Sequence, residues 1–209
     1  MTRLPSHFYA MVDLAGGHEP VSLAETLLDA GARIMQLRLK DAPGRDFLAA
    51  ARTIAEMCRK RGATLIVNDR VDIAVLAGAD GVHLGQTDLP LEAARRVAGP
   101  NMIIGISTHN VEQARAAENS GAAYIGFGPM YPGGLRNNAT GMGLNNLRAI
   151  RAAVKIPIVA IGGITEARVA ETLAAGADAV AIITDVLNAP DLSAKVRAIL
   201  AIVGPSAPL

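Results

Sequence analysis

The sequence predicts an α/β protein that folds as a single (β/α)8, or TIM, barrel. Three observations lead to this prediction. Short apolar runs of strand length alternate with amphipathic helical stretches along the 209 residues, and such alternation implies a parallel sheet. Hydrophobic residues make up 51% of the chain, as expected for strands that are covered on both sides. The third observation is an internal repeat in which a helix ends at glycine and a strand follows.

Eight apolar runs are expected to form the strands. Between them, the clearest helix is predicted over 46–62, where apolar residues recur at helical spacing and Gly62 follows a basic last turn. Cys58 lies on the apolar face of this helix and is expected to be a buried, inert thiol. The predicted strands lie at 7–13, 33–39, 64–68, 80–84, 102–107, 122–127, 157–161 and 178–184.

The internal repeat supports a count of eight units. The strings DAGARIMQL, LAGADGVHL, NSGAAYIGF and LAAGADAVAI place Gly31, Gly78, Gly121 and Gly176 at helix ends before strands. Each separation between successive glycines is about two strand–helix units long, so four pairs give eight units, which suits a closed barrel. The alternative is a doubly wound open sheet, against which no G-x-G-x-x-G follows the first strand.

Composition excludes several classes of protein. The 20 basic and 19 acidic residues leave a net charge of +1, which argues against a nucleic-acid-coating protein. No uncharged apolar run reaches the length of a membrane-spanning helix, and the opening residues do not read as a signal peptide. A single cysteine suits a reducing cytoplasm. We expect one domain over 1–209, with short flexible tails at about 1–5 and 204–209.

The chemistry of such a barrel lies at the carboxyl ends of its strands. At the end of the second strand, Gln36, Arg38 and Lys40 share one face, and Leu37 and Leu39 share the other. Two cations are too costly to bury deep in the barrel unpaired, so they belong at its mouth, where they suit a phosphate or diphosphate. The alternative is a salt-bridged strand end without a ligand.

Two aspartates follow the next two strands. Asn68 and Asp69 end the third strand, and Asp88 comes shortly after the fourth. Neighbouring strands lie about 4.8 Å apart, so Asp69 and Asp88 are close enough to share one Mg²⁺, directly or through water. The alternative is that one of them, Asp69 or Asp88, is the N-cap of the helix that follows it.

The fifth strand ends in Ser107, Thr108 and His109. A hydroxyl at this position is suited to hydrogen-bond a leaving group or a polar ring. We expect His109 to cap or orient the following helix rather than to take part in catalysis. His83, inside the fourth strand, is expected to be structural.

A second anion site is predicted in the same mouth. Gly162 and Gly163 follow the seventh strand and Thr184 ends the eighth, and loops in these positions often bind phosphate. Residues 128–143 form a connection long enough to be a functional loop, and Arg136 is the cation that such a lid would carry to a bound diphosphate. The alternative for this segment is an insertion without a function.

Together these features predict a transferase that displaces diphosphate. Cations and a metal would stabilise the leaving charge at one site, while the other site would hold a monophosphate. The sequence shows no nucleophile–base pair for covalent catalysis and no Cys/His metal cluster.

Six motifs of the chain resemble thiamine-phosphate synthase, in that family's order and over nearly the whole length. They are QLRLK (36–40), VND (67–69), GVHLGQTD (81–88), GIS (105–107), GFGP (126–129) and IGGI (161–164). The resemblance implies that hydroxymethylpyrimidine diphosphate is joined to hydroxyethylthiazole phosphate, giving thiamine phosphate and pyrophosphate. It further implies a dissociative reaction, in which a pyrimidine carbocation forms before the thiazole nitrogen attacks.

The resemblance also implies a role for each matching residue. It assigns Gln36, Asn68 and Ser107 to the pyrimidine, Arg38 and Lys40 to the diphosphate, Asp69 and Asp88 to Mg²⁺, and Gly163 and Thr184 to the thiazole phosphate. Where the family usually has Thr-x-Thr-Lys, this chain has Gly133-Gly134-Leu135-Arg136. We expect Arg136 and the glycine N–H groups to replace the missing side chains.

Two other functions are compatible with the sequence. Thiazole tautomerases share the fold but tend to lose the metal aspartates, which are present here. A non-catalytic binder of thiamine precursors would keep the anion sites. The altered lid sequence is the observation that favours this function. For each function we expect small-molecule partners, without nucleic acid or membrane, and a monomer or homo-oligomer in the cytoplasm.

Overall fold

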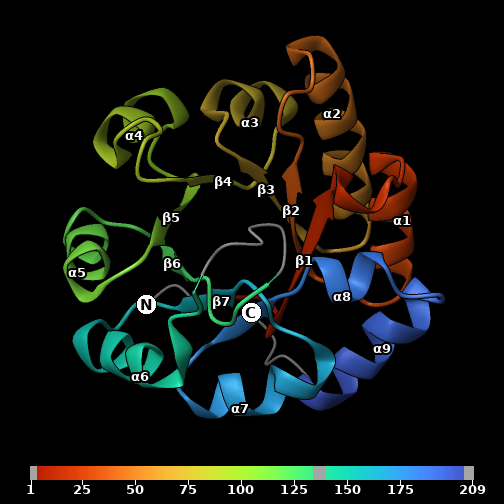
Figure 1. Ribbon diagram of the computed structural model, residues 1–209. Coiled ribbons are helices and arrows are strands. Elements are labelled where there is room, and N and C mark those ends of the chain that lie inside the picture. The colour runs from red at the N-terminus through yellow and green to blue at the C-terminus, as the bar shows by residue number, and fades with distance from the viewer. Residues whose placement is uncertain (1–3, 134–139, 205–209) are drawn as a thin grey trace.

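Parallel strands close into a barrel in which spatial neighbours follow chain order, and β8 pairs with β1 to complete the ring. The computed structural model describes residues 4–133 and 140–204. Figure 1 looks into the ring of strands, with the helices arranged around it. The strands are β1 (Phe8–Asp13), β2 (Ile34–Arg38), β3 (Thr64–Asn68), β4 (Gly81–Leu84), β5 (Ile103–Thr108), β6 (Tyr124–Phe127), β7 (Ile158–Ile161) and β8 (Ala179–Ala181). The predicted barrel is therefore confirmed, and the open-sheet alternative is wrong.

The helices form the outer layer. Two short 3₁₀ turns, η1 (Leu14–Gly16) and η2 (Glu166–Arg168), supplement them. Within the described ranges, no helix has both the length and the apolar character needed to cross a membrane. The helices are α1 (Pro20–Asp29), α2 (Gly44–Lys60), α3 (Val71–Ala77), α4 (Leu91–Ala98), α5 (Val111–Asn119), α6 (Gly143–Ala153), α7 (Val169–Ala174), α8 (Thr184–Leu187) and α9 (Leu192–Val203).

Each strand sends alternate side chains to the helices and to the barrel interior. In β2, Met35 and Leu37 are fully buried in the large core between strands and helices. Ile34 lies in a second, smaller core inside the barrel, and Gln36 and Arg38 face a cavity above it. The interior core consists of Tyr9, Met11, Ile34, Ile66, Tyr124, Val159, Ala179 and Ala181. The polar side chains of the barrel interior therefore lie toward the carboxyl ends of the strands, around the cavity.

The repeated glycines occupy equivalent places in the fold. Gly31, Gly78, Gly121 and Gly176 each lie between the end of a helix and the next strand, with φ between 66° and 111°. Side-chain-bearing residues rarely adopt this conformation, so the repeat reflects a backbone requirement that recurs around the barrel.

The predicted strand boundaries agree with the structure to within two residues, except at the last strand. There the range 178–184 is wrong at its end, because β8 stops at Ala181 and Thr184 begins α8. The continuous apolar run through this region gives no alternation that would mark where pairing ends. Cys58 is 1% exposed on the inner face of α2, as predicted. Residues 1–3 and 205–209 of the predicted tails lie outside the described ranges.

Candidate active site

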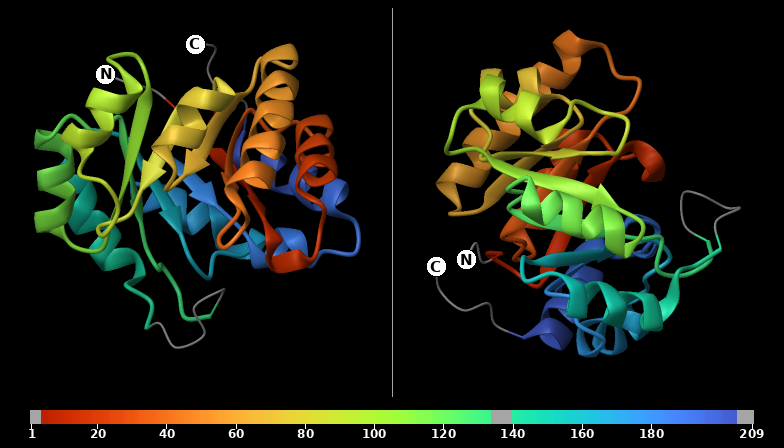
Figure 2. Two further views of the ribbon diagram at one scale, coloured as in Figure 1. Left: turned by 90° about the horizontal axis from the view of Figure 1, so that it is seen from above. Right: turned by 90° about the vertical axis from the view of Figure 1, so that its left-hand side faces the viewer.

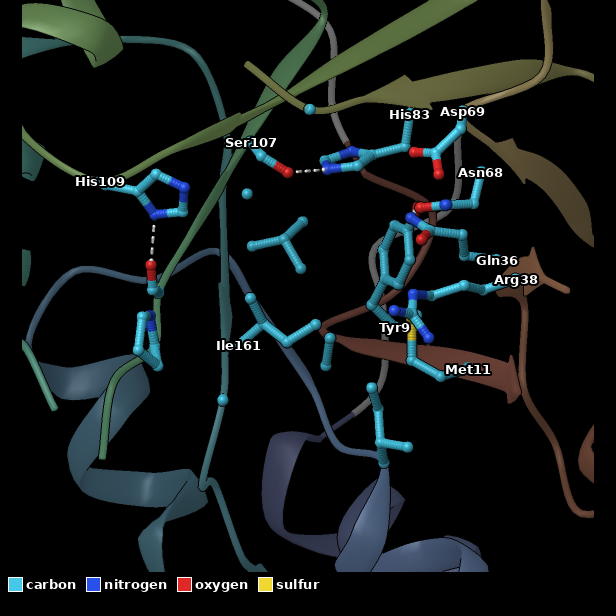
Figure 3. A pocket seen from close by; sticks show the side chains of 18 of the residues that line it. Tyr9, Met11, Gln36, Arg38, Asn68, Asp69, His83, Ser107, His109 and Ile161 are labelled. Atoms are coloured by element: carbon cyan, nitrogen blue, oxygen red, sulfur yellow. Dashed lines mark hydrogen bonds between the residues drawn. The ribbon is translucent and has the colours of Figure 1, made fainter. Parts of the chain in front are cut away.

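A cavity of about 520 Å³ opens at the carboxyl ends of the strands. In Figure 2 the described residues on either side of the loop after β6, 128–133 and 140–142, lie at this end of the barrel. Arg136 lies outside the described residues. The other predicted site residues all line the cavity: Gln36, Arg38, Lys40, Asn68, Asp69, Asp88, Ser107, Gly163 and Thr184. Figure 3 shows Gln36, Arg38, Asn68, Asp69 and Ser107 among the side chains around it.

The guanidinium of Arg38 is held at the cavity by a buried carboxylate. Asp13 of β1 lies opposite Arg38 in the strand register, and Arg38 Nη1 donates to Asp13 Oδ2 at 2.5 Å. Asp13 is 4% exposed, while 26% of the Arg38 side chain remains accessible. A guanidinium has five N–H donors, so this ion pair fixes Arg38 and leaves further donors for an anion. Arg38 is therefore in a salt bridge, as the alternative stated, but it still has N–H donors that can bind a ligand.

Asp13 is a residue of the site that was not predicted from the sequence, although the sequence carries a signal for it. Asp13 is an acidic residue at the end of an otherwise apolar strand, which is the same pattern that identified Asp69. Its other carboxylate oxygen accepts the Ala15 N–H at 2.9 Å, so Asp13 also fixes the turn η1. Recognising its partner required the register between β1 and β2.

The two predicted metal-binding aspartates lie together. Lys40 Nζ approaches Asp69 Oδ2 at 4.0 Å, and Asp88 accepts the Gly85 N–H at 2.6 Å. Burial, and then the neighbouring Asp88 carboxyl group, raise the pKa of Asp69 above its ordinary value. A carboxyl group whose negative charge is disfavoured by burial and by a neighbouring carboxyl group marks a place where a cation would be stabilised.

The helix-cap alternative for these aspartates is wrong. Arg70 is the N-cap residue of α3 and Pro90 that of α4, and neither helix has a side-chain cap hydrogen bond. Asp69 instead adopts a left-handed conformation with φ of 62°, which directs the chain into α3.

We call Asp13, Arg38, Lys40, Asp69 and Asp88 the mouth cluster.

The donor set of the mouth cluster suits Mg²⁺ when a phosphate ligand is present. Among the described residues, no group of three or more His, Cys, Asp or Glu side chains is arranged to hold a metal. Mg²⁺ is usually bound by one or two carboxylates together with waters and substrate phosphates. Asp69 and Asp88 therefore fit a metal that arrives with, or is completed by, a diphosphate.

Below the mouth, hydrogen bonds join five side chains across the barrel. Gln36 Nε2 donates to Tyr9 Oη at 3.0 Å, and the Tyr9 and Tyr124 hydroxyls lie 2.7 Å apart. His83 Nδ1 lies 3.0 Å from Tyr124 Oη, and His83 Nε2 lies 2.9 Å from Ser107 Oγ. We call Gln36, Tyr9, Tyr124, His83 and Ser107 the floor chain. Figure 3 shows the His83–Ser107 contact.

Burial fixes the charge state of the floor chain. It lowers the pKa of His83 to about 4, so the ring is neutral at pH 7. Burial also raises the pKa of the Tyr9 and Tyr124 hydroxyls, which keeps both protonated. The expectation that His83 is structural therefore needs extension, because His83 also lines the cavity and contacts Ser107.

On the opposite side of the mouth the cavity is lined by backbone and uncharged side chains. Gly162 and Gly163 adopt φ of 96° and 65°. A Cβ on Gly163 would lie 2.6 Å from the Tyr131 carbonyl oxygen, so glycine lets this loop pack against the start of the loop after β6. Arg168 donates to the Gly163 carbonyl at 2.7 Å. Thr184 completes this side at the start of α8, not at the end of a strand as predicted.

The ring of His109 joins two strand ends and does not cap the following helix, which was one of the roles expected for it. Its Nδ1 lies 2.7 Å from the Gly128 carbonyl oxygen, which ties the end of β5 to the end of β6. The N-cap of α5 is Asn110, whose side chain accepts the Gln113 N–H. Because a carbonyl oxygen accepts, Nδ1 carries the proton in this contact.

Comparisons with known proteins agree on one family. The family model described as thiamine monophosphate synthase matches residues 8–186. The thiamine-phosphate synthase of Moorella thermoacetica is 47% identical over 185 residues, 88% of each chain. That of Methanoculleus marisnigri is 46% identical over 194 residues, which are 91% of this chain and 92% of the relative.

Solved structures give the same result. Thiamine phosphate pyrophosphorylase from Pyrococcus furiosus superposes with a TM-score of 0.88 at 37% identity, covering 95% of this chain and 96% of the other. A 3-hexulose-6-phosphate synthase superposes with a TM-score of 0.72 at 18% identity. The second likeness extends to the barrel fold alone.

Proposed function

The chain belongs to the thiamine monophosphate synthase family of transferases, and on that premise we propose that it joins hydroxymethylpyrimidine diphosphate to hydroxyethylthiazole phosphate and releases pyrophosphate. The observation that supports this reaction best is the mouth cluster beside the floor chain. One cavity combines cations and paired carboxylates, suited to a diphosphate, with neutral hydrogen-bonding groups, suited to a polar ring. The cavity is large enough for small molecules of this kind.

We assign the diphosphate to the mouth cluster. Arg38, held by Asp13, would bind phosphate oxygens through its remaining N–H groups, and the ammonium of Lys40 would add a second positive charge. Asp69 and Asp88 would hold Mg²⁺, which would neutralise negative charge on the diphosphate. Charge accumulates on this group as it leaves, so fixed cations at this position lower the barrier.

We assign the pyrimidine to Gln36, Asn68 and Ser107, which face the cavity below the mouth. In the proposed reaction the carbon–oxygen bond between the methylene group and the diphosphate breaks, and the electron pair leaves with the diphosphate. The thiazole nitrogen then supplies a lone pair to the resulting carbocation. No proton has to be transferred for this bond to form. The proposed reaction therefore needs no nucleophile–base pair.

We assign the thiazole phosphate to Gly163 and Thr184 on the far side of the cavity. Two glycines give the phosphate close access to backbone N–H groups, and the Thr184 hydroxyl adds a donor. Lys195 braces this side, because its ammonium contacts Glu166 at 2.9 Å and Asp185 at 3.4 Å. Arg136, on the loop after β6, remains our candidate for a further diphosphate contact.

Incubation of the protein with both substrates and Mg²⁺ tests this proposal. We expect thiamine phosphate and pyrophosphate to appear in equal amounts, and omission of either substrate or chelation of Mg²⁺ to stop both. Isomerisation of a thiazole carboxylate phosphate without thiamine phosphate would indicate a tautomerase instead. Tight binding of both substrates without product would indicate a binder.

A further inference from the structure

The floor chain links two residues that the proposed function places on the same ring. Gln36 and Ser107 come from β2 and β5, and the connection between them passes through β1, β6 and β4. Tyr9 and Tyr124 are each 1% exposed, and His83 is 8% exposed. The three hydrogen bonds that join Gln36, Tyr9, Tyr124 and His83 are buried, so the tyrosine hydroxyls and His83 Nδ1 must find their partners within the floor chain. The contact between His83 and Ser107 lies at the cavity and is partly buried.

Space for this chain is provided by glycines on the neighbouring strands. A Cβ on Gly105 would lie 2.1 Å from Cζ of Tyr124, and one on Gly126 would lie 3.0 Å from Cε1 of His83. Real Cβ atoms do not approach other atoms as closely as the first of these. The two aromatic rings can thus reach each other because β5 and β6 carry no side chain at these points.

The chain has a direction, which follows from counting protons. Gln36 donates an N–H to Tyr9 Oη, so the Tyr9 hydroxyl must donate its own hydrogen bond to Tyr124 Oη. The Tyr124 hydroxyl in turn donates to His83 Nδ1. A neutral imidazole has one N–H and one bare nitrogen. His83 therefore carries its proton on Nε2 and donates it to Ser107 Oγ, which leaves the Ser107 proton directed to the cavity.

We propose that Tyr9, Tyr124 and His83 are positioning residues that make the Ser107 hydroxyl a hydrogen-bond donor to an acceptor atom of the bound pyrimidine. The identity of that ligand rests on the proposed function. Reversing the direction would require Gln36 to turn its amide so that Oε1 faces Tyr9, with every proton between Gln36 and Ser107 moving as well. The orientation of Gln36 and the role of Ser107 are thus set together, although they lie on different sides of the cavity.

The tautomer of His83 tests this proposal without any turnover. In an ¹⁵N-labelled protein, the ring signals of His83 are assigned by their absence from His83→Gln. We expect a protonated Nε2 and a bare Nδ1 at neutral pH. A proton on Nδ1 would overturn the proposal, and this result is independent of whether the protein makes thiamine phosphate.

A double-mutant cycle tests whether Tyr124 acts through Ser107. Tyr124→Phe removes the proton given to Nδ1 and leaves the ring in place, so kcat/KM for the pyrimidine substrate should fall about tenfold, with KM for the thiazole phosphate unchanged. In a Ser107→Ala background, Tyr124→Phe should cause no further loss. Losses that simply multiply would overturn the proposal.

Thr108→Val is the matched control. Thr108 follows Ser107 in β5, is fully buried and donates to the Gly126 carbonyl oxygen at 3.1 Å, but it does not line the cavity. Its loss removes a buried hydroxyl one residue away and should leave kcat/KM at the wild-type value. If Thr108→Val lowered kcat/KM as much as Tyr124→Phe, the effect of Tyr124 would reflect general damage near β5 and the proposal would fail.

Discussion

The mouth cluster and the floor chain lie in the same cavity but use opposite electrostatics. The mouth cluster is charged and partly exposed, and burial together with Asp88 raises the pKa of Asp69. The floor chain is neutral and buried, and burial lowers the pKa of His83 to about 4. Crowded charges suit a ligand that brings a cation and negative charge, whereas a neutral chain suits a polar ring that must be oriented. The comparison indicates how one cavity can bind the charged end of a substrate at the mouth and its polar ring at the floor.

The largest expected effect comes from removing a charge at the mouth. Asp88→Asn keeps an oxygen that can accept the Gly85 N–H but loses the negative charge. We expect kcat to fall about 100-fold or more, on the scale of other groups that stabilise transition-state charge. The Mg²⁺ concentration for half-maximal activity should rise as well. Turnover assays across a Mg²⁺ titration measure both quantities.

Glu92→Gln provides the control for Asp88→Asn. It makes the same chemical change at an exposed position in the first turn of α4, outside the cavity lining. It should leave the Mg²⁺ titration unchanged. Full activity of Asp88→Asn at limiting Mg²⁺ would remove the metal from this end of the site.

Acid should weaken the floor chain. The pKa of His83 is about 4 in the folded protein and 6.5 ordinarily, so the unfolded chain binds the proton more tightly. The free energy of unfolding therefore decreases as the pH falls from 6.5 toward 4, and the full difference is about 3 kcal/mol. Urea denaturation at a series of pH values measures this loss.

His83→Gln removes the titrating ring from the same position. Its free energy of unfolding should be lower than that of the wild type at pH 7 but should change less between pH 6.5 and 4. A wild-type and a variant curve that run parallel through this interval would contradict the assignment to His83.

The mouth cluster was largely predictable from the sequence, and the floor chain was not. Arg38, Asp69 and Asp88 are recognisable because they are charged residues at or shortly after the ends of apolar strands, where an unpaired buried charge would be costly. Tyr9 and Tyr124 lie inside apolar runs, where an aromatic ring is indistinguishable from ordinary core packing. Their role depends on β1 and β6 meeting across a closed barrel, which is a consequence of the three-dimensional closure and not of local pattern.

A smaller effect should separate Arg38 from the residue that holds it. Arg38→Ala removes the guanidinium and should lower kcat/KM for the diphosphate substrate by about 30–100-fold, as expected for a charged hydrogen-bonding group. Asp13→Asn keeps an acceptor for Ala15 N–H but weakens the ion pair with Arg38. It should lower kcat/KM by about fivefold, mainly through KM.

The two variants together test whether Asp13 acts through Arg38. In the Arg38→Ala background, Asp13→Asn should have little further effect on kcat/KM, since the group that it positions is gone. If Asp13→Asn alone left KM at the wild-type value, the ion pair would be a feature of stability and not of binding.

The smallest expected effect is on stability, and its direction is opposite to that for His83. The raised pKa of Asp69 means that the folded protein binds this proton more tightly than the unfolded chain. The contribution of Asp69 to the free energy of unfolding therefore falls as the pH rises through that pKa. Asp69→Asn removes this cost, and asparagine tolerates the left-handed φ of 62° at this position.

We therefore expect Asp69→Asn to be slightly more stable than the wild type at pH 7 without divalent cations, while its Mg²⁺-dependent activity is lost. Urea denaturation should give a higher midpoint with an unchanged slope. Asp88→Asn should relieve the same repulsion, so the double variant should gain less than the sum of the two single variants. A lower midpoint for Asp69→Asn would mean that the attraction of Asp69 to Lys40, 4.0 Å away, outweighs burial and the repulsion from Asp88. The charges of the mouth cluster would then compensate one another without a metal.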